Sequence, residues 1–304
     1  MTKSIGKHAS RITTAACYLA IYFIWGSTYL AISVSIRTIP IFLSNTIRFI
    51  SAGAILLLIA MLRRTEKPSR ANLTIALKSG ALAFFTAFAC LSWAEKILPS
   101  STAALVISLE PAWFVLFDWM FFRGPKPGKR VFLSQIAGIL GCAILVLGEG
   151  LSTPDAASAA RYAIAACVVT ASGFSWVYGS LLSSKSPDSH PDPAMASGLQ
   201  MICGGLIFAA FSLCTGDLSQ LPQVSTESWL ATLYLSIFGS VIAYSAYITL
   251  LRTQPASKVS THSFVNPIVA VLMGWALAGE AVTIYTAIAS LLIVVSVIVI
   301  IRQN

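Results

Sequence analysis

Charge is what this sequence has least of. Only 10% of its 304 residues are charged, with 20 Lys and Arg against 11 Asp and Glu, whereas a soluble domain carries about 25% charged residues. So few charged side chains cannot cover the surface of a water-soluble globule of this size, and the mean hydropathy of +0.81 agrees with this. Abundant apolar residues (57%), and glycines without a three-residue period, exclude a disordered or collagen-like chain. The solvent of this chain is therefore mostly lipid.

Metal-binding and catalytic motifs are absent as well. Neither H-E-x-x-H, nor G-x-S-x-G, nor a P-loop occurs, and the three histidines cannot place two metal ligands on one helix. The six cysteines fall in apolar stretches without a C-x-x-C pair, which predicts packing residues and no disulfide framework. Binding of nucleic acid would require a basic face on a soluble domain. The sequence has no such domain, so the net charge of +9 does not indicate a nucleic-acid partner. The sequence predicts neither a cofactor nor an enzyme.

Long apolar runs are what the sequence does contain. In a bilayer every backbone polar group must be satisfied internally, and about 20 apolar residues in a helix span the roughly 30 Å core. Ten such runs predict ten transmembrane helices in an all-α membrane protein. The runs cover residues 13–36, 40–62, 73–94, 99–122, 131–149, 160–183, 194–215, 227–251, 257–279 and 282–302.

The basic residues predict the orientation of these helices. Sixteen of the 20 Lys and Arg fall in the segments on one side of the membrane, counted from the N-terminus. Three fall on the other side (Arg37, Lys96 and Arg161), and Arg48 lies within a run. Because short cytoplasmic loops are enriched in Lys and Arg, both termini are predicted to be cytoplasmic.

The two halves of the chain resemble each other at a constant spacing. Five helices per half is an odd number, so the second copy would enter the membrane from the opposite side, as in many secondary transporters. We therefore predict two inverted five-helix repeats, 1–150 and 151–304, within one membrane domain. The matching pairs are Pro99 with Pro255, Ser101 with Ser257, Pro111 with Pro267 and Trp119 with Trp275 at an offset of 156, and, more weakly, Trp25 with Trp176.

A series of short motifs resembles the EamA-type branch of the drug/metabolite transporter superfamily. The resemblance implies ten helices in two inverted repeats around a central cavity, and transport, often export, of small metabolites or drugs. This chain departs from the family pattern at Arg123-Gly124, where the family often has Gly-Glu. The motifs are Trp25-Gly26-Ser27-Thr28-Tyr29-Leu30, Trp93-Ala94-Glu95, Pro99-Ser100-Ser101-Thr102, Glu110-Pro111, Val265-Asn266-Pro267 and Gly279-Glu280.

Aromatic and hydroxyl side chains recur at helical spacing along several runs. Residues three or four apart share a helix face, and mixed aromatic and polar faces suit an amphipathic organic solute. The alternative is that these side chains only join helices together. The candidate solute-binding residues from these faces are Trp25, Tyr29, Phe88, Ser92, Trp176, Tyr244, His262 and Asn266.

Two charged residues lie deep within runs and complete the predicted site. Arg48 and Glu110 lie roughly 12 and 16 Å from the predicted outer ends of their helices. They are expected to face a common interior, where they pair or share a substrate. Glu110-Pro111 and the equivalent Asn266-Pro267 predict breaks in both helices. A structural ion pair with two packing kinks is the alternative. Glu95, beside Lys96, is expected at the outer rim.

These features together predict a multi-pass carrier of the bacterial inner (plasma) membrane. It would export small amphipathic metabolites, such as amino acids or drug-like solutes, by alternating access. An intramembrane enzyme and a small-solute channel remain the alternatives. The expected partners are a small-molecule substrate, membrane lipid and, if transport is coupled, protons, with the protein a monomer or a homodimer.

Overall fold

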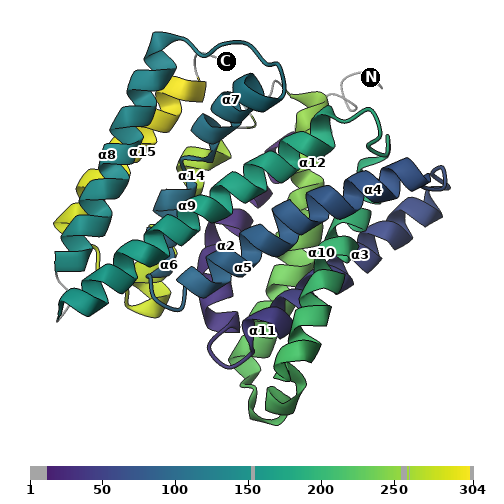
Figure 1. The fold of residues 1–304 in the computed structure, drawn as a ribbon, viewed down its shortest axis with the longest axis horizontal. Helices are drawn as coiled ribbons and strands as arrows, with labels where there is room; N and C mark the ends of the chain where they lie inside the picture. The colour runs from purple at the N-terminus through teal and green to yellow at the C-terminus, as the bar shows by residue number, and fades with distance from the viewer. Residues whose placement is uncertain (1–11, 152–154, 255–258, 260, 302–304) are drawn as a thin grey trace.

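A computed structural model describes residues 12–151, 155–254, 259 and 261–301, and these residues contain helices and connecting turns but no strand (Figure 1). Several long helices consist of two or three stacked segments. The helical segments are η1 Ala20–Ile24, α2 Trp25–Ser35, α3 Ile41–Leu62, α4 Arg70–Ser79, η2 Gly80–Thr86, α5 Ala87–Ala94, α6 Ser100–Ile107, α7 Glu110–Phe121, α8 Lys129–Leu151, α9 Ala156–Lys185, α10 Pro193–Thr215, η3 Asp217–Gln223, α11 Thr226–Tyr234, η4 Leu235–Ile242, α12 Ala243–Thr253, α14 His262–Ala278 and α15 Ile284–Ile301.

Each of the ten predicted apolar runs coincides with a helix or a stack of helical segments. Eight of them are long and apolar enough to cross a membrane, and two shorter apolar stretches, His262–Ala278 and Ile284–Ser296, follow. The predicted start of the ninth run at 257, with the repeat partners Pro255 and Ser257, lies outside the described residues. The all-helical membrane class is confirmed, whereas the count of ten crossings stays a prediction.

The helices pack in pairs that join the two halves of the chain. α3 packs along α10, α8 along α15, and α6 against α14. In Figure 1 the α8–α15 pair lies at one side of the molecule and the α3–α10 pair at the other. Under the predicted repeat, each pair consists of two equivalent helices. The aromatic side chains of Phe49, Phe84 and Phe208 fill the core between α3, η2 and α10.

Two π-helical segments occupy places that are equivalent under the predicted repeat. η2 and η4 begin at residues 80 and 235, close to the offset of the predicted repeat. A π segment disturbs the helical hydrogen-bond ladder and is frequent at functional sites. Each of these two provides a carbonyl to a neighbouring helix. Ser175 Oγ donates to the Leu82 carbonyl at 2.8 Å, and Trp25 Nε1 donates to the Gly239 carbonyl at 3.1 Å. The π segments therefore tie the halves together.

The predicted pair of helix breaks is half correct. The fourth run is interrupted at Ser108 and Leu109, between α6 and α7, and Pro111 lies in the first turn of α7. In contrast, α14 continues through Asn266 and Pro267, so the prediction of an equivalent break there is wrong. Pro267 is only the sixth residue of α14, where its missing N–H removes one hydrogen bond near the helix start. The buried Pro267 therefore lies within a continuous helix.

Gly80 and Gly204 let two helices approach at backbone distance. A Cβ atom on Gly80 would lie 2.4 Å from the Gln200 carbonyl oxygen, and one on Gly204 would lie 2.9 Å from the Gly80 oxygen. Small residues at such crossings permit close packing of membrane helices. The contact between η2 and α10 therefore depends on the absence of side chains at these two positions.

We expect Gly80→Ala to destabilise the protein, although alanine is the better helix former. Forcing the backbones apart costs about 1–3 kcal/mol, which exceeds the roughly 1 kcal/mol that alanine gains over glycine in a helix. The matched control is Gly128→Ala, because a Cβ there meets no atom within 4 Å. Thermal unfolding in detergent, followed by size-exclusion chromatography, measures the difference. Equal melting temperatures for the two variants would contradict the predicted close contact.

Candidate functional site

Arg48 is buried within the helix bundle and only partly satisfied. It lies on α3 with 5% of its surface exposed. Its Nε donates to Ser240 Oγ in η4 at 3.0 Å, and the guanidinium lies 4.9 and 4.5 Å from the ring centroids of Phe49 and Phe88. Nη1 has no hydrogen-bond partner among the described residues. A buried cation with a free N–H group is costly in a membrane and marks a candidate binding group.

Glu95 is a second buried charge close to Arg48. It caps the end of α5 with 6% of its surface exposed, and neither carboxylate oxygen has a partner among the described residues. It interacts electrostatically with the carboxylate of Glu280 and, more weakly, with Arg48, with which it forms no ion pair. Glu95 lies at the end of α5, so its expected place at the outer rim stays a prediction, although its side chain is buried. The turn after α5 exposes Lys96, whereas Glu95 stays buried, three residues beyond the fully buried Ser92.

Glu110 does not pair with Arg48 as predicted. The one ion pair in the described part of the chain joins Lys185 and Asp118 at 2.9 Å. Glu110 begins α7 and faces α9, where a Cβ on Gly173 would lie 3.8 Å from Glu110 Cγ. Tyr29 interacts electrostatically with both Glu110 and Glu95. The two acids therefore lie near one tyrosine, and the acid that interacts with Arg48 is Glu95.

Three of the predicted site residues belong to one aromatic group. The ring of Trp25 lies 5.1 Å from those of Tyr247 and His262, and Tyr244 lies 6.3 Å from Tyr247. The Trp25 indole donates to the carbonyl of Gly239, the residue before the Ser240 that binds Arg48. The aromatic group and the buried arginine therefore meet at η4.

Trp176 lies beside Phe88, one of the two rings that contact Arg48, whereas the predicted site residues Ser92 and Asn266 form hydrogen bonds between helices. The Trp176 ring lies 5.9 Å from that of Phe88. Ser92 Oγ accepts a hydrogen bond from Asn45 Nδ2 at 3.1 Å. With its amide nitrogen turned toward η1, Asn266 donates to the Ile21 carbonyl at 3.0 Å. Ser92 and Asn266 are thus engaged between helices.

Glu95, Ser240 and Tyr247 also belong to this group, and helical spacing predicts them on the same faces as the candidate residues. Ser92 is three before Glu95, and Tyr244 is four after Ser240 and three before Tyr247.

A carboxylate closes the predicted outer end of the bundle. Glu280, after α14, accepts four hydrogen bonds from the first turn of α6. Its Oε1 receives the Ser100 N–H and hydroxyl at 2.8 and 2.7 Å, and its Oε2 receives those of Ser101 at 3.0 and 2.5 Å. We call this contact the Glu280 clasp. It places an anion at a helix N-terminus, where the free N–H groups and the helix dipole favour one.

A second buried carboxylate reinforces the same end. Glu149 in α8 accepts hydrogen bonds from the hydroxyl groups of Thr102, Tyr162 and Thr286. These residues come from α6, α9 and α15. Three consecutive residues of α6, from 100 to 102, therefore bind carboxylates from elsewhere in the fold.

At the place that the predicted repeat makes equivalent in the first half, the clasp has no counterpart. Arg123 and Gly279 are 156 residues apart and share left-handed backbone conformation, with φ of 60° and 67°. Arg123 is followed by Gly124, whereas Gly279 is followed by Glu280. The departure from the family pattern at Arg123-Gly124 thus keeps the backbone turn and removes the carboxylate.

Apolar helices that surround buried charged and aromatic side chains, with π segments beside them, define a polytopic membrane protein of the transporter class. The chain matches the EamA-like transporter family over residues 13–147 and 163–302. It is 31% identical over 266 residues to the uncharacterized inner membrane transporter YedA of Escherichia coli (strain K12), covering 87% of this chain and 82% of the relative. It is 28% identical over 254 residues to protein PecM of Dickeya dadantii (strain 3937), covering 83% and 80%. The chain belongs to the EamA-like transporter family.

A solved crystal structure supports the fold. It superimposes with a TM-score of 0.62 and covers 94% of this chain and 95% of its own, at 19% sequence identity. This likeness shows the fold alone. The family assignment identifies the chain as a multi-pass membrane transporter.

Proposed function

We propose that this protein is a secondary carrier that exports small amphipathic solutes with a carboxylate group, such as amino acids. The observation that carries the proposal is Arg48, a buried guanidinium with an unpaired N–H, flanked by two phenylalanine rings. A guanidinium binds a carboxylate through two parallel hydrogen bonds. The rings of Phe49, Phe88 and Trp176 would contact the apolar part of the solute.

Glu95 extends the proposal to the other end of the solute. Its two oxygens, which have no partner among the described residues, are acceptors for an ammonium group, and it interacts with Arg48 without forming an ion pair. A zwitterion placed between the two residues would satisfy both charges. Removing such charges from water is favourable only where each gains a partner. An amino acid has the required combination of carboxylate, ammonium and apolar side chain.

Alternating access is the proposed mode of transport. The helix pairs that join the halves, the equivalent π segments and the shared turn at Arg123 and Gly279 support two inverted repeats, 1–150 and 151–304. The basic residues support cytoplasmic termini. The relative YedA is described as an inner membrane transporter, which supports the same location here.

The proposal is tested with purified protein in proteoliposomes. A carrier gives saturable uptake of a labelled amino acid that speeds up when unlabelled amino acid is loaded inside. Analogues lacking the carboxylate should compete poorly, because they leave Arg48 unpaired. A screen of solutes excreted on overexpression selects the labelled compound and the direction. Unitary currents, or uptake without saturation, would instead indicate a channel.

Glu110 is the proposed proton carrier of this transport. In Glu110→Gln, we expect uptake driven by a proton gradient to fall at least about tenfold, because the amide cannot be ionised, a loss in the range of one proton-transfer group. Exchange of solute for solute should change little, since no net proton movement is needed. Glu227→Gln, an exposed carboxylate, is the matched control. Wild-type uptake that is insensitive to the gradient would contradict coupling through Glu110.

A further inference from the structure

A pocket of about 380 Å³ lies between the end of α5 and the beginning of α9. It is lined by Trp93, Lys96, Ile97, Arg161 and Ile164. Both helices belong to candidate membrane spans, so their exposed faces meet lipid. The pocket lies at helix ends, which is the level of the lipid headgroups.

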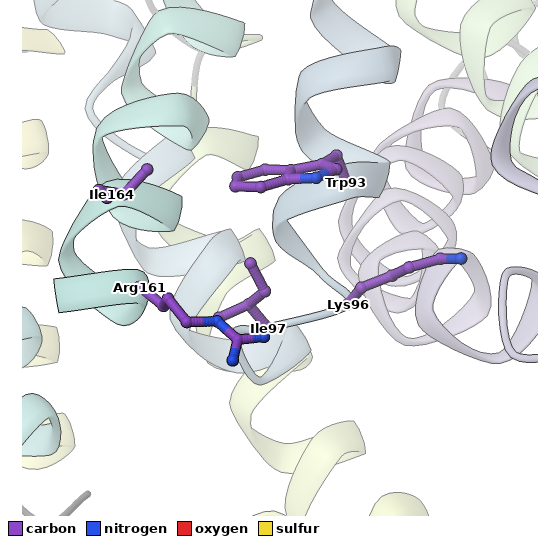
Figure 2. A pocket seen from close by; sticks show the side chains of 5 residues that line it. All are labelled: Trp93, Lys96, Ile97, Arg161 and Ile164. Carbon is purple, nitrogen blue, oxygen red and sulfur yellow. The ribbon is translucent and has the colours of Figure 1, made fainter. Parts of the chain in front are cut away.

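The side chains of the pocket combine positive charge with apolar surface. Figure 2 shows the Trp93 indole reaching toward Ile164, with the Arg161 guanidinium beside Ile97 and Lys96 extending away at the far side. Trp93 and Ile164 are 41% and 55% exposed. Tryptophan at this level is typical of residues that anchor a protein at the membrane interface.

The pocket holds most of the basic residues of the predicted outer side. Lys96 and Arg161 are two of the three basic residues that the sequence places outside, where such residues are scarce. Asp155 interacts electrostatically with Arg161. The backbone hydrogen bond from Ser158, with a smaller contribution from Arg161, holds the pKa of the Asp155 carboxyl below its ordinary value. The Asp155 carboxylate caps α9 through the Ser158 N–H, and a guanidinium has five N–H donors, enough to bind a further anion.

We infer that this pocket binds an anionic phospholipid such as phosphatidylglycerol. Arg161 would bind the phosphate, Lys96 would contribute charge at the rim, and the acyl chain would follow Ile164 along α9. A guanidinium suits phosphate oxygens, and basic residues near a membrane surface attract anionic lipids. The apolar walls formed by Trp93, Ile97 and Ile164 favour a lipid over a free phosphate ion. This site is independent of the transport mechanism proposed above.

The test compares lipid binding to delipidated full-length protein by native mass spectrometry. We expect phosphatidylglycerol to bind more tightly than phosphatidylcholine, and Lys96→Gln and Arg161→Gln each to weaken it about fivefold, following the free energy per basic residue near a surface. Arg37→Gln is the matched control, as the third exposed basic residue of this side. Lipids with brominated acyl chains should quench more tryptophan fluorescence in the wild type than in Trp93→Phe, which lacks the indole of the pocket.

Several outcomes would overturn the inference. Equal binding of the two lipids would remove the selectivity for charge, and an equal loss in Arg37→Gln would show that only overall charge matters. Displacement of the lipid by millimolar inorganic phosphate would indicate a free-anion site instead. The pocket substitutions lie on exposed residues, so a normal size-exclusion profile confirms that the variants are folded.

Discussion

Replacing Arg48 by glutamine is expected to lower solute exchange by about 30-fold or more without lowering the thermal stability of the protein. The loss follows from removing one partner of a buried charge pair, which costs about 2–5 kcal/mol in binding. Stability should be unchanged or higher, because the guanidinium is buried with an unpaired N–H, and burying an incompletely paired charge opposes folding. Exchange rates in proteoliposomes and melting temperatures in detergent measure the two quantities.

The split between activity and stability separates the proposed binding role from a structural one. If Arg48 only held Ser240 and the phenylalanine rings together, Arg48→Gln would lower both quantities in parallel. Arg63→Gln is the matched control, because Arg63 follows the same helix and is exposed. Arg48→Lys retains the charge without the planar fork and should recover only part of the activity. Normal exchange in Arg48→Gln would remove this residue from the site.

Substitution of Glu95 tests which chemical group of the substrate this residue binds. Glu95→Gln should weaken transport of zwitterionic solutes and affect analogues without an ammonium group much less, since the carboxylate is proposed to bind that group. A double variant of Arg48 and Glu95 should show non-additive losses, as expected for residues that bind one ligand. Additive losses for every solute would indicate two independent sites.

The helices were predictable because long apolar runs and basic loops are properties of the composition. The ends of α3 and α10 agree with the predicted runs within one residue. Lipid leaves a polar backbone no alternative to internal hydrogen bonds, so run length determines where a helix lies. The burial of Arg48 could be predicted for the same reason, as it interrupts an apolar run.

The site was less predictable, because it depends on local backbone geometry. The π segment η4 brings Ser240 to Arg48 and the Gly239 carbonyl to Trp25, and nothing in the residues of η4 signals a π helix. Glu95 lies at a helix end beside the exposed Lys96, yet its side chain is buried, as the helical face shared with Ser92 indicated. Helical spacing was therefore a better guide to the burial of this side chain than the charge of the adjacent residue.

The break expected at Pro267 is an error of the sequence prediction. A proline near the start of a helix removes few hydrogen bonds, and the predicted start at 257 placed Pro267 deeper in the helix than the described α14 does. At the equivalent Pro111 the prediction is correct, because the interruption at Ser108 and Leu109 falls in the turn before the proline, where its ring clashes with the carbonyl four residues earlier. The depth of the proline in its helix therefore decided which of the two breaks formed.

Breaking the Glu280 clasp is expected to have the second large effect. Glu280→Ala removes the acceptor of four hydrogen bonds from Ser100 and Ser101. Hydrogen bonds to a charged group contribute about 1.5–3 kcal/mol each after exchange with water. We therefore expect the first turn of α6 to open, and amide hydrogen exchange across residues 100–102 to rise at least about tenfold, which corresponds to a local loss of about 1.4 kcal/mol. Ser100→Ala with Ser101→Ala keeps both backbone donors and should give an intermediate increase.

The same measurement decides whether the clasp moves during transport. Alternating access requires the predicted outer ends of α6 and α14 to separate once in each cycle, and the clasp joins them. Exchange at residues 100–102 should then rise in the wild type when substrate is supplied on both sides, whereas Glu280→Ala should exchange fast with or without substrate. Glu227→Gln, an exposed carboxylate near the start of α11, should behave as the wild type. If turnover does not change the protection of these amides from hydrogen exchange in the wild type, the clasp stays closed throughout transport. The helices would then have to separate elsewhere, and the absence of a carboxylate at Gly124 marks the opposite end as the place to look.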